Sequence, residues 1–304
     1  MEKTFYSNGK LLLTGEYVVL DGALALALPT KYGQSLFVKE GTGKKISWKS
    51  HDADGSLWYE DTIQFNEILS NSNHESTDSV RKTLLEILRE AYLLNTDFID
   101  NSDGYSVTTK LTFPKEWGLG TSSTLINNIA QWLHIDAFAL LKNSFGGSGY
   151  DIACAQNHTP ILYHISHKIP VVDPVGFDPA FKDKLYFVYL NRKQSSKAAI
   201  ETYKKARKGT IQGFDTISQI TQKVLHATSL TDFEALLSAH ETAMGKLLDI
   251  TPVKQDLFPD FDGFVKSLGA WGGDFVLVAS DENPTDYFKQ KGYHTIIPYH
   301  EMIL

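Results

Sequence analysis

The sequence predicts an α+β protein with two domains, residues 1–178 and residues 179–304. In both halves, short apolar runs typical of strands are followed by a mixture of strand-like and helix-like stretches, and this order indicates an α+β architecture. Three prolines and a glycine within residues 170–179 separate two strand-like runs, and such clusters mark domain boundaries. A chain of 304 residues is long enough to give each half its own core.

Composition and charge exclude several classes of function. The apolar fraction of 42% and the charged fraction of 21% are those of ordinary globular proteins. The net charge of −7 argues against a general nucleic-acid partner, since counterion release requires a basic face. Cys154 is the single cysteine, so no intrachain disulfide can form. Because no signal peptide or run of ~18 apolar residues is found, we expect a cytoplasmic protein with a small-molecule substrate. We expect no nucleic-acid or membrane partner, and a homodimer is left open.

In the first half, short apolar or alternating runs between turn residues predict strands. These strands are expected at Leu11–Leu20, Ala23–Leu28, Gln34–Lys39, in a hairpin within 41–62, at Tyr105–Phe113 and at Ile161–Ile165. Apolar residues at helical spacing predict helices. These helices are expected from Asp78 or Ser79 to about Leu94, through Leu125, Ile129 and Leu133, from Asp136 to Phe145, and from Tyr150 onward, and a polar loop is expected at Asn71–Asp78.

The second half is expected to be rich in helices. Its expected helices cover Ser195–Arg207, Phe214–Ala227, Asp232–Leu248 and Phe261–Leu268. Its expected strands cover Lys184–Leu190, Phe275–Ala279 and Thr295–Pro298. The residues from 170 to 179, between the expected strands Ile161–Ile165 and Lys184–Leu190, are expected to form the linker.

The segment from Gly118 to Ser123 has the composition of a phosphate-binding loop. It lies between a predicted strand and a predicted helix, and its glycines allow the backbone to approach an anion. The free amides and the dipole of the following helix favour negative charge. It is neither a Walker A motif nor a GxGxxG dinucleotide motif. A glycine turn with a Thr or Ser helix cap explains the same residues equally well when the segment is taken alone.

Four segments in order resemble motifs of the GHMP kinases, the superfamily of galactokinase, homoserine kinase, mevalonate kinase and phosphomevalonate kinase. These segments are Asn8–Tyr17, Pro114 with Gly118–Ser123, Gly147–Ala153 and Gly269–Phe275. The third is similar to a GHMP subgroup with the string Gly-Tyr-Asp-Ile-Ala, and the first looks like mevalonate-type kinases. The resemblance implies an N-terminal domain like domain 2 of ribosomal protein S5 and a ferredoxin-like C-terminal domain. It implies an ATP- and Mg²⁺-dependent kinase for mevalonate or phosphomevalonate in isoprenoid precursor synthesis.

The resemblance also implies roles for individual residues. Asp151 would face the acceptor hydroxyl, and Lys10 would lie beside it and neutralise charge on the phosphoryl group. Ser122 would be a metal ligand. ATP is expected on Gly118, Leu119, Gly120, Thr121, Ser122, Ser123, Gly272 and Gly273, and the acceptor on Glu16, Tyr17, Ser148 and Lys197. Arg192 and Lys193 join Lys197 as candidate cations for a phosphorylated acceptor.

Two departures from the family pattern leave alternatives open. The acid that binds metal one helix earlier in mevalonate kinases is missing, since no acidic residue lies between Asp136 and Asp151. Trp271 stands where the last motif has glycine, and an indole there would narrow the phosphate end of the site. A protein of GHMP fold that binds a nucleotide or metabolite without turnover is therefore the alternative, as is a kinase for another acceptor such as homoserine. Taken alone, Asp151 could equally be a carboxylate at a helix start and Lys10 a solvated lysine.

Overall fold

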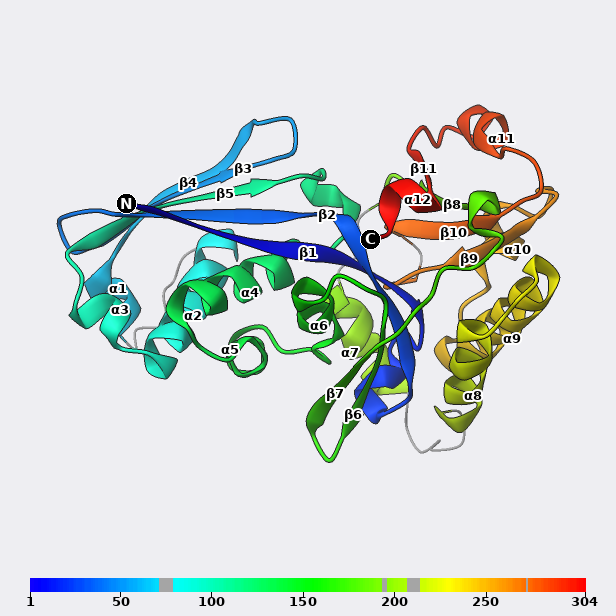
Figure 1. The fold of residues 1–304 in the computed structure, drawn as a ribbon, viewed down its shortest axis with the longest axis horizontal. Helices are drawn as coiled ribbons and strands as arrows, with labels where there is room; N and C mark the ends of the chain where they lie inside the picture. The colour runs from blue at the N-terminus through cyan, green and yellow to red at the C-terminus, as the bar shows by residue number, and fades with distance from the viewer. Residues whose placement is uncertain (71–78, 193–195, 207–213, 272) are drawn as a thin grey trace. The chain divides into compact units, whose positions relative to one another are not determined.

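The computed structural model describes residues 1–70, 79–192, 196–206, 214–271 and 273–304 (Figure 1). The chain forms two compact units. Unit 1 contains Met1–Gly9, Tyr32–Lys115 and Leu119–Gln156, and unit 2 contains Lys10–Lys31, Glu116–Gly118 and Asn157–Leu304. The units differ in extent from the expected domains because Lys10–Lys31 and residues 157–178 group with the C-terminal half. The domain boundary at residue 178 stays a prediction.

Unit 1 contains a mixed sheet with the strand order β4-β3-β5-β2. The strands are β2 (Ala25–Glu40), β3 (Lys45–His51), β4 (Leu57–Gln64) and β5 (Gly104–Leu111), and β1 (Glu2–Thr14) pairs with β2. Strands β3 and β4 form the predicted antiparallel hairpin, whereas β3 and β5 run parallel. The part of β2 from Gln34 to Glu40 pairs with β5. The expected strand at Tyr105–Phe113 is confirmed within two residues at each end.

Helices cover one face of this sheet, as Figure 1 shows. They are α1 (Phe65–Leu69), α2 (Ser79–Leu94), α3 (Asp97–Asp100), α4 (Thr121–Leu133), α5 (Ala137–Ser144) and α6 (Tyr150–Gln156). The apolar stripe of α2, which includes Leu84 and Leu88, is buried against sheet residues such as Trp48 and Val107. Periodic apolar spacing therefore predicts these longer helices well, because the stripe that defines it is the face that the core buries.

Unit 2 contains an antiparallel sheet of order β11-β8-β10-β9 and, separately, β6 and β7 beside the first part of β2. The strands are β6 (Ile161–Ser166), β7 (Ile169–Pro174), β8 (Leu185–Tyr189), β9 (Phe264–Ser267), β10 (Phe275–Ala279) and β11 (Ile296–Pro298). Every residue of β10 is buried, because β10 is a central strand with β8 and β9 on its two sides.

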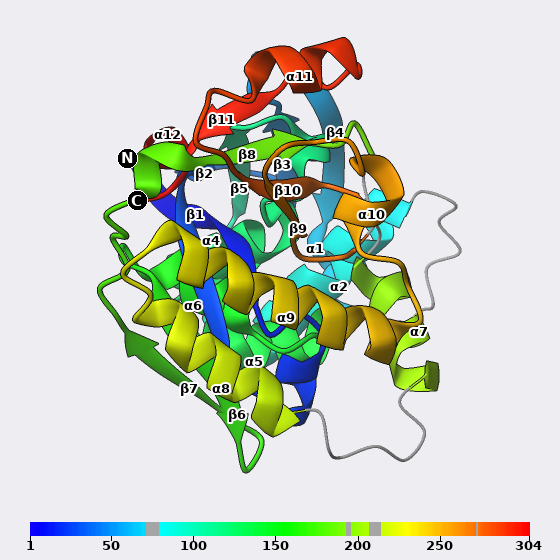
Figure 2. The ribbon, with the colours of Figure 1, turned by 90° about the vertical axis from the view of Figure 1, so that its right-hand side faces the viewer.

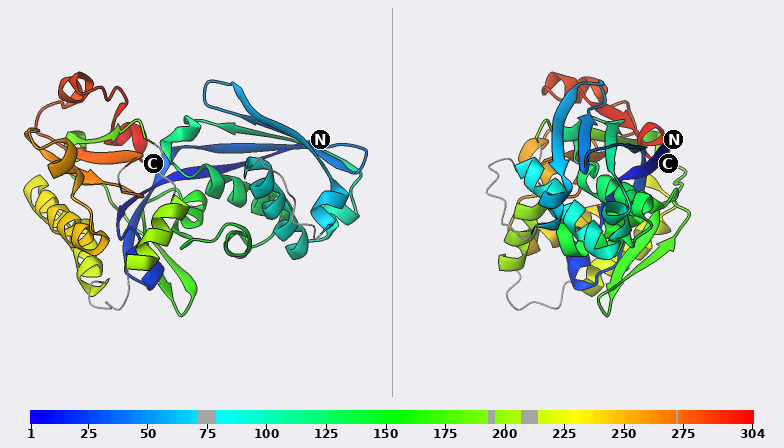
Figure 3. Two further views of the ribbon diagram at one scale, coloured as in Figure 1. Left: turned by 180° about the vertical axis from the view of Figure 1, so that it is seen from behind. Right: turned by 90° about the vertical axis from the view of Figure 1, so that its left-hand side faces the viewer.

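The helices of unit 2 include two long ones, α8 and α9, which lie side by side (Figure 2). The helices are α7 (Ser196–Ala206), α8 (Phe214–Leu225), α9 (Leu230–Leu248), α10 (Val253–Leu257), α11 (Thr285–Gln290) and α12 (Tyr299–Met302). Helix α9 also packs against β9, as the view from behind shows (Figure 3). Among the described residues, no helix is long and apolar enough to cross a membrane.

Three local predictions are wrong, each for a physical reason. Phe261–Leu268 was expected to be helical from its spaced apolar residues, but β9 occupies its centre and pairs with β10. Residues 170–179 were expected to form a linker, but β7 begins at Ile169 and pairs with β6. Its two prolines are tolerated because β7 is an edge strand. The end of Leu11–Leu20 is not a strand, since the chain turns at Gly15 (φ 86°) into a 3₁₀ helix, η1 (Val18–Asp21).

Two further short 3₁₀ helices, η2 (Lys115–Trp117) and η3 (Lys182–Lys184), complete the described elements. The expected loop at Asn71–Asp78 lies outside the described residues.

Candidate active site

The glycine-rich loop leads from Gly118 into the start of α4. Gly118 (φ 68°) and Gly120 (φ 100°) adopt left-handed backbone conformations that residues with a Cβ rarely adopt. Gly120 is the N-cap of α4, and among the described side chains none caps the helix. The first turn of α4 contains no acidic residue. Its amides and the helix dipole therefore form a favourable place for an anion.

The three hydroxyl residues at the start of α4 are not equivalent. Thr121 and Ser122 are partly exposed, whereas Ser123 is only 3% exposed. The Ser123 hydroxyl donates a hydrogen bond to the Gly120 carbonyl oxygen at 2.9 Å and so holds the loop to the helix. Next to it, the Thr124 hydroxyl lies 3.0 Å from the side-chain oxygen of Gln34. Ser122 is therefore better placed than Ser123 to reach a ligand.

Lys10 contacts the first glycine of the loop. Its Nζ atom donates a hydrogen bond to the Gly118 carbonyl oxygen at 2.9 Å, and both residues belong to unit 2. Lys10 lies on β1, 108 residues before Gly118 in the sequence. The contact thus joins two segments that the resemblance assigned to one site, the first motif and the phosphate loop.

Asp274 lies against the same glycine and was missed by the sequence reasoning. A Cβ atom on Gly118 would come within 2.4–2.7 Å of the carboxyl carbon and both carboxyl oxygens of Asp274, so only glycine fits there. Asp274 directly precedes β10 and has a left-handed backbone (φ 52°). An acidic residue inside a glycine-rich motif was the available signal.

Tyr17 is partly buried against an apolar cluster of unit 2. Its ring stacks on Tyr203 with centroids 5.6 Å apart, and Trp271 is buried in the same apolar cluster. Burial, with smaller contributions from the charges of Glu16 and Asp274, raises the pKa of the Tyr17 hydroxyl to about 12. Tyr17 therefore stays protonated at neutral pH and can donate a hydrogen bond. Trp271 is 5% exposed, so most of its indole packs in the core.

Glu16 belongs to a buried cluster of ionisable groups. Its Oε1 atom accepts a hydrogen bond from Lys266 Nζ at 2.5 Å, and Glu241 Oε1 lies 3.9 Å from the same nitrogen. The Gly15 amide donates to His240 Nε2 at 3.0 Å. Because burial lowers the pKa of His240 well below its usual value, this ring is neutral and can accept that bond. At 1% exposure, Glu16 is placed to hold the turn that ends in Tyr17, and its predicted contact with the acceptor stays a prediction.

Unit 1 carries Asp151 on α6, which packs against α4 (Figure 1). The side-chain nitrogen of Gln156 on α6 donates to the Asn127 side-chain oxygen on α4 at 3.0 Å, so the two helices are tied together. Asp151 is partly exposed, and three glycines with positive φ, at 146, 147 and 149, precede its helix together with Ser148. Asp151 and Lys10 belong to different units, so their predicted proximity stays a prediction.

The remaining predicted residues lie partly outside the described chain. Gly272, Lys193 and the side chain of Lys197 are not described. Gly273 is buried, and Arg192 is exposed.

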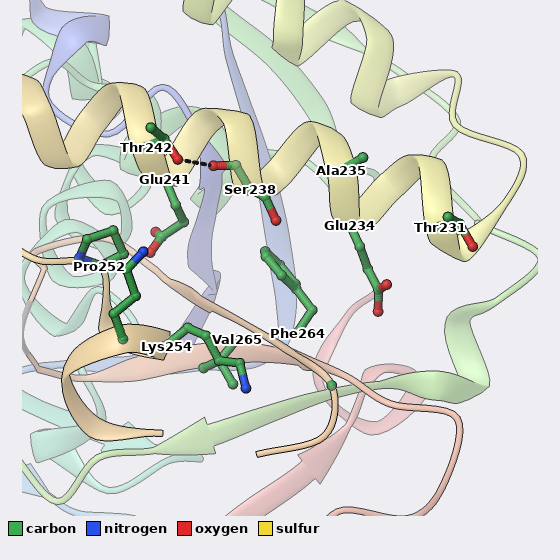
Figure 4. Close-up of a pocket in the computed structure, with 12 residues that line it drawn as sticks. Thr231, Glu234, Ala235, Ser238, Glu241, Thr242, Pro252, Lys254, Phe264 and Val265 are labelled. Carbon is green, nitrogen blue, oxygen red and sulfur yellow. Dashed lines mark hydrogen bonds between the residues drawn. The ribbon is translucent and has the colours of Figure 1, made fainter. Parts of the chain in front are cut away.

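A separate cavity of about 410 Å³ lies between α9, α10 and β9 in unit 2 (Figure 4). Glu241 reaches it from α9, and Lys254 and Phe264 line the opposite side. None of the residues predicted for the active site lines it.

The residues at the glycine loop fit a metal nucleotide. Among the described residues, no group of three or more His, Cys, Asp or Glu side chains could hold a metal ion by itself. A nucleotide-bound Mg²⁺ needs no such group, since one or two carboxylates, phosphate oxygens and waters suffice. The Asp274 carboxylate at Gly118 provides that chemistry, and a Cβ at Gly118 would fill the space that this carboxylate occupies.

Comparison with solved structures identifies the class of fold. No family model matches the chain, and no curated protein matches it in sequence. Mevalonate kinase from Methanococcus jannaschii matches with a TM-score of 0.69 at 17% identity, over 98% of this chain and 97% of that chain. Phosphomevalonate kinase from Streptococcus pneumoniae, in complex with phosphomevalonate and AMPPNP, matches with a TM-score of 0.69 at 15% identity, over 95% of each chain. Galactokinase from Lactococcus lactis, complexed with galactose, matches with a TM-score of 0.63 at 13% identity, over 95% of this chain and 88% of that chain.

The protein therefore has the fold of the GHMP kinases, and the predicted α+β class is confirmed. At these identities the likeness establishes the fold and does not distinguish one acceptor from another.

Proposed function

We propose that the protein is an ATP-dependent small-molecule kinase that transfers the γ-phosphoryl group to a small acid. The observation that carries this proposal is the contact of Lys10 Nζ with Gly118 at the entrance to an uncapped helix α4. A glycine loop, helix amides and a lysine together provide the positive environment that phosphoryl transfer requires. The fold shared with kinases of small molecules supports the same class of reaction.

Each group has a defined task in this proposal. The amides of the Gly118–Ser123 loop bind the nucleotide phosphates, and the Lys10 ammonium offsets charge that develops on the transferring group. With mevalonate as the acceptor, Asp151 accepts the proton of its hydroxyl, whose oxygen attacks the γ-phosphorus while the bond to the departing ADP oxygen breaks; with phosphomevalonate, an oxygen of its phosphate makes this attack. Mg²⁺, when bound with ATP, neutralises phosphate charge, and Ser122 offers it a hydroxyl oxygen.

The proposed acceptors are mevalonate and phosphomevalonate, with mevalonate first. The segments around Glu16 and Asp151 favour this choice because they look like those of mevalonate-type kinases. The fold alone does not, since galactokinase has a similar TM-score. The missing acid before Asp151 favours the second candidate, a GHMP-fold protein that binds nucleotide without turnover.

A coupled assay of ADP release with a panel of acceptors tests the proposal. The panel contains mevalonate, phosphomevalonate, homoserine and galactose, each with MgATP. We expect release above the no-acceptor background with mevalonate or phosphomevalonate. ADP release only with homoserine or galactose would support the proposed kinase activity and contradict the proposed acceptors. Nucleotide binding without release for any acceptor would favour the second candidate.

Arg192 offers a test between the two preferred acceptors. It is exposed, and the phosphate that distinguishes phosphomevalonate from mevalonate requires an additional cation. Substitution of Arg192 and Lys193 by alanine should raise KM for phosphomevalonate alone if that compound is the acceptor. An equal effect on KM for both compounds would show that these residues do not bind the phosphate of phosphomevalonate.

A further inference from the structure

Asp274 holds a carboxylate beside the first glycine of the proposed phosphate loop. The carboxyl group lies so close to Gly118 that any Cβ there would collide with it. Lys10 Nζ reaches the carbonyl oxygen of the same residue. Three separate segments of unit 2 therefore bring the carboxylate of Asp274 and the ammonium of Lys10 to Gly118.

The backbone of Asp274 is fixed in an unfavourable conformation. Its φ of 52° lies in the left-handed region, where residues other than glycine are uncommon, although Asp and Asn tolerate it best. Two backbone hydrogen bonds hold it there: the Asp274 amide donates to the Arg192 carbonyl at 2.6 Å, and the Leu190 amide donates to the Asp274 carbonyl at 2.8 Å. Strain that the surrounding sheet maintains in this way is frequent at functional sites.

The negative charge of Asp274 is better suited to a nucleotide that carries a cation than to a free nucleotide. A carboxylate beside a phosphate repels it and cancels much of the attraction that Lys10 provides. A divalent cation between the two anions converts this repulsion into attraction, because carboxylate and phosphate oxygens are the ligands that Mg²⁺ prefers. The charge pattern at Gly118 is therefore suited to a metal nucleotide and poorly suited to a free one.

We propose that Asp274 is the acidic ligand of the nucleotide-bound Mg²⁺, in place of the acid that is missing between Asp136 and Asp151. This inference rests on the proposed function, since it requires that ATP bind at the Gly118–Ser123 loop. It assigns to the last glycine-rich motif a metal-binding role besides its expected role in holding ATP. Asp274 then selects the metal complex of ATP over the free nucleotide.

Asp274→Asn is the decisive variant, because asparagine keeps the size of the side chain and tolerates a left-handed backbone. Mn²⁺ is the probe, and its binding in the presence of ATP is measured from the electron paramagnetic resonance signal of free Mn²⁺. Loss of even an outer-shell partner of a metal costs at least about tenfold in affinity, so we expect a loss of that size or larger. Binding of ATP without metal, measured by calorimetry, should be unchanged or tighter because the repulsion is removed.

Asp281→Asn is the matched control. Asp281 also lies in unit 2, but its side chain is 80% exposed and pairs with Lys184. Its Mn²⁺ affinity should equal that of the wild type. An Asp274→Asn protein that binds Mn²⁺ with ATP as tightly as the wild type would overturn the inference and leave the kinase proposal standing. A wild-type protein that binds no nucleotide, with or without metal, would overturn both.

Asp274→Cys provides a second test, which can be used if the Asp274→Asn variant is unstable. A thiolate prefers the soft ion Cd²⁺ to Mg²⁺, so nucleotide binding in this variant should become dependent on Cd²⁺. The only native cysteine, Cys154, is buried, so the substitution can be made in the wild-type sequence without replacing it. An unchanged order of preference between Cd²⁺ and Mg²⁺ would contradict direct ligation.

Discussion

Ser122 and Ser123 are neighbours in the loop with different surroundings. Ser122 is partly exposed, whereas Ser123 is buried and bonded to the Gly120 carbonyl. Ser122→Ala should raise the Mg²⁺ concentration needed for half-maximal turnover and leave metal-free nucleotide binding unchanged. Ser123→Ala should instead lower the free energy of unfolding by about 1 kcal/mol, the usual net value of one hydrogen bond. Mg²⁺ titrations and urea unfolding of both variants separate these effects. If Ser122→Ala has the same metal dependence as the wild type, Ser122 is not a metal ligand.

Asp151 gives the second prediction at the residue scale. Asp151→Asn should keep the fold and ATP affinity but lower kcat by about 10²-fold or more, as expected for a lost proton acceptor. Asp136→Asn is the control, because Asp136 caps α5 through the Phe138 amide and asparagine caps helices equally well. Single-turnover kinetics with saturating MgATP provide the measurement. Wild-type turnover in Asp151→Asn would remove Asp151 from the mechanism.

The buried cluster of Glu16, Lys266, His240 and Glu241 acts at the scale of elements. It connects the turn after β1 with α9 and β9, since Glu16 follows β1, Glu241 lies on α9 and Lys266 lies on β9. Removing one member of a buried ion pair leaves the other charge uncompensated. Lys266→Met should therefore lower the free energy of unfolding by about 3–5 kcal/mol.

Urea unfolding measures this loss, with Lys184→Met as the control. Lys184 pairs with Asp281 on the surface, and its loss should change stability by no more than about 1 kcal/mol. The double variant Glu16→Gln with Lys266→Met should recover part of the loss. Equal, small effects of both lysine substitutions would show that the buried pair contributes nothing.

Glu241 makes the stability of unit 2 depend on pH. Burial raises its pKa from 4.5 to about 7. Between these values the folded protein binds more protons at this site than the unfolded chain does, so its contribution to stability falls as pH rises and is constant above the folded pKa. Glu241→Gln should remove this fall. We expect the difference in unfolding free energy between the wild type and the variant to change between about pH 4.5 and pH 7. A difference that stays constant over this range would contradict the raised pKa.

At the same scale, elements with a clear apolar stripe could be predicted from sequence, and elements defined by their partners could not. Helices α2 and α4 were predicted because their periodic residues are the ones that the core buries. Strand β9 is only four residues long, and its pairing with β10 decides its conformation. The pattern around Phe261 and Leu268 carries no sign of that pairing.

The candidate site was predictable to the extent that it follows recognisable motifs. The loop from Gly118 and the lysine at position 10 were proposed in this way, and Lys10 contacts Gly118, the first residue of the loop. Asp274 was missed because its contact is with a glycine 156 positions earlier, and the only local sign of it is an acidic residue within a glycine-rich motif. The sequence also does not reveal Lys266 as the buried partner of Glu16, whose predicted contact with the acceptor stays a prediction.

At the scale of the whole molecule, the chain passes repeatedly between its two units. Lys10–Lys31 belongs to unit 2 although both neighbouring segments belong to unit 1, and strand β2 contributes to both. The proposed catalytic groups follow this division, with Lys10 and Asp274 in unit 2 and Asp151 with Ser122 in unit 1. A sequence read from end to end predicts consecutive domains and gives no sign of such interleaving.

Transfer of a labelled phosphoryl group tests directly whether the protein phosphorylates a mevalonate-type acceptor. ATP labelled in its γ-phosphoryl group is incubated with Mg²⁺, mevalonate or phosphomevalonate, and either the wild type or Asp151→Asn, and the acceptor is then isolated. With the wild type, we expect the label to appear in one of the two acceptors. With Asp151→Asn, we expect labelling to be at least about 10²-fold slower. Absence of label from both acceptors with the wild type would contradict the proposed activity on mevalonate-type compounds, and equal labelling by the two proteins would contradict the proposed role of Asp151.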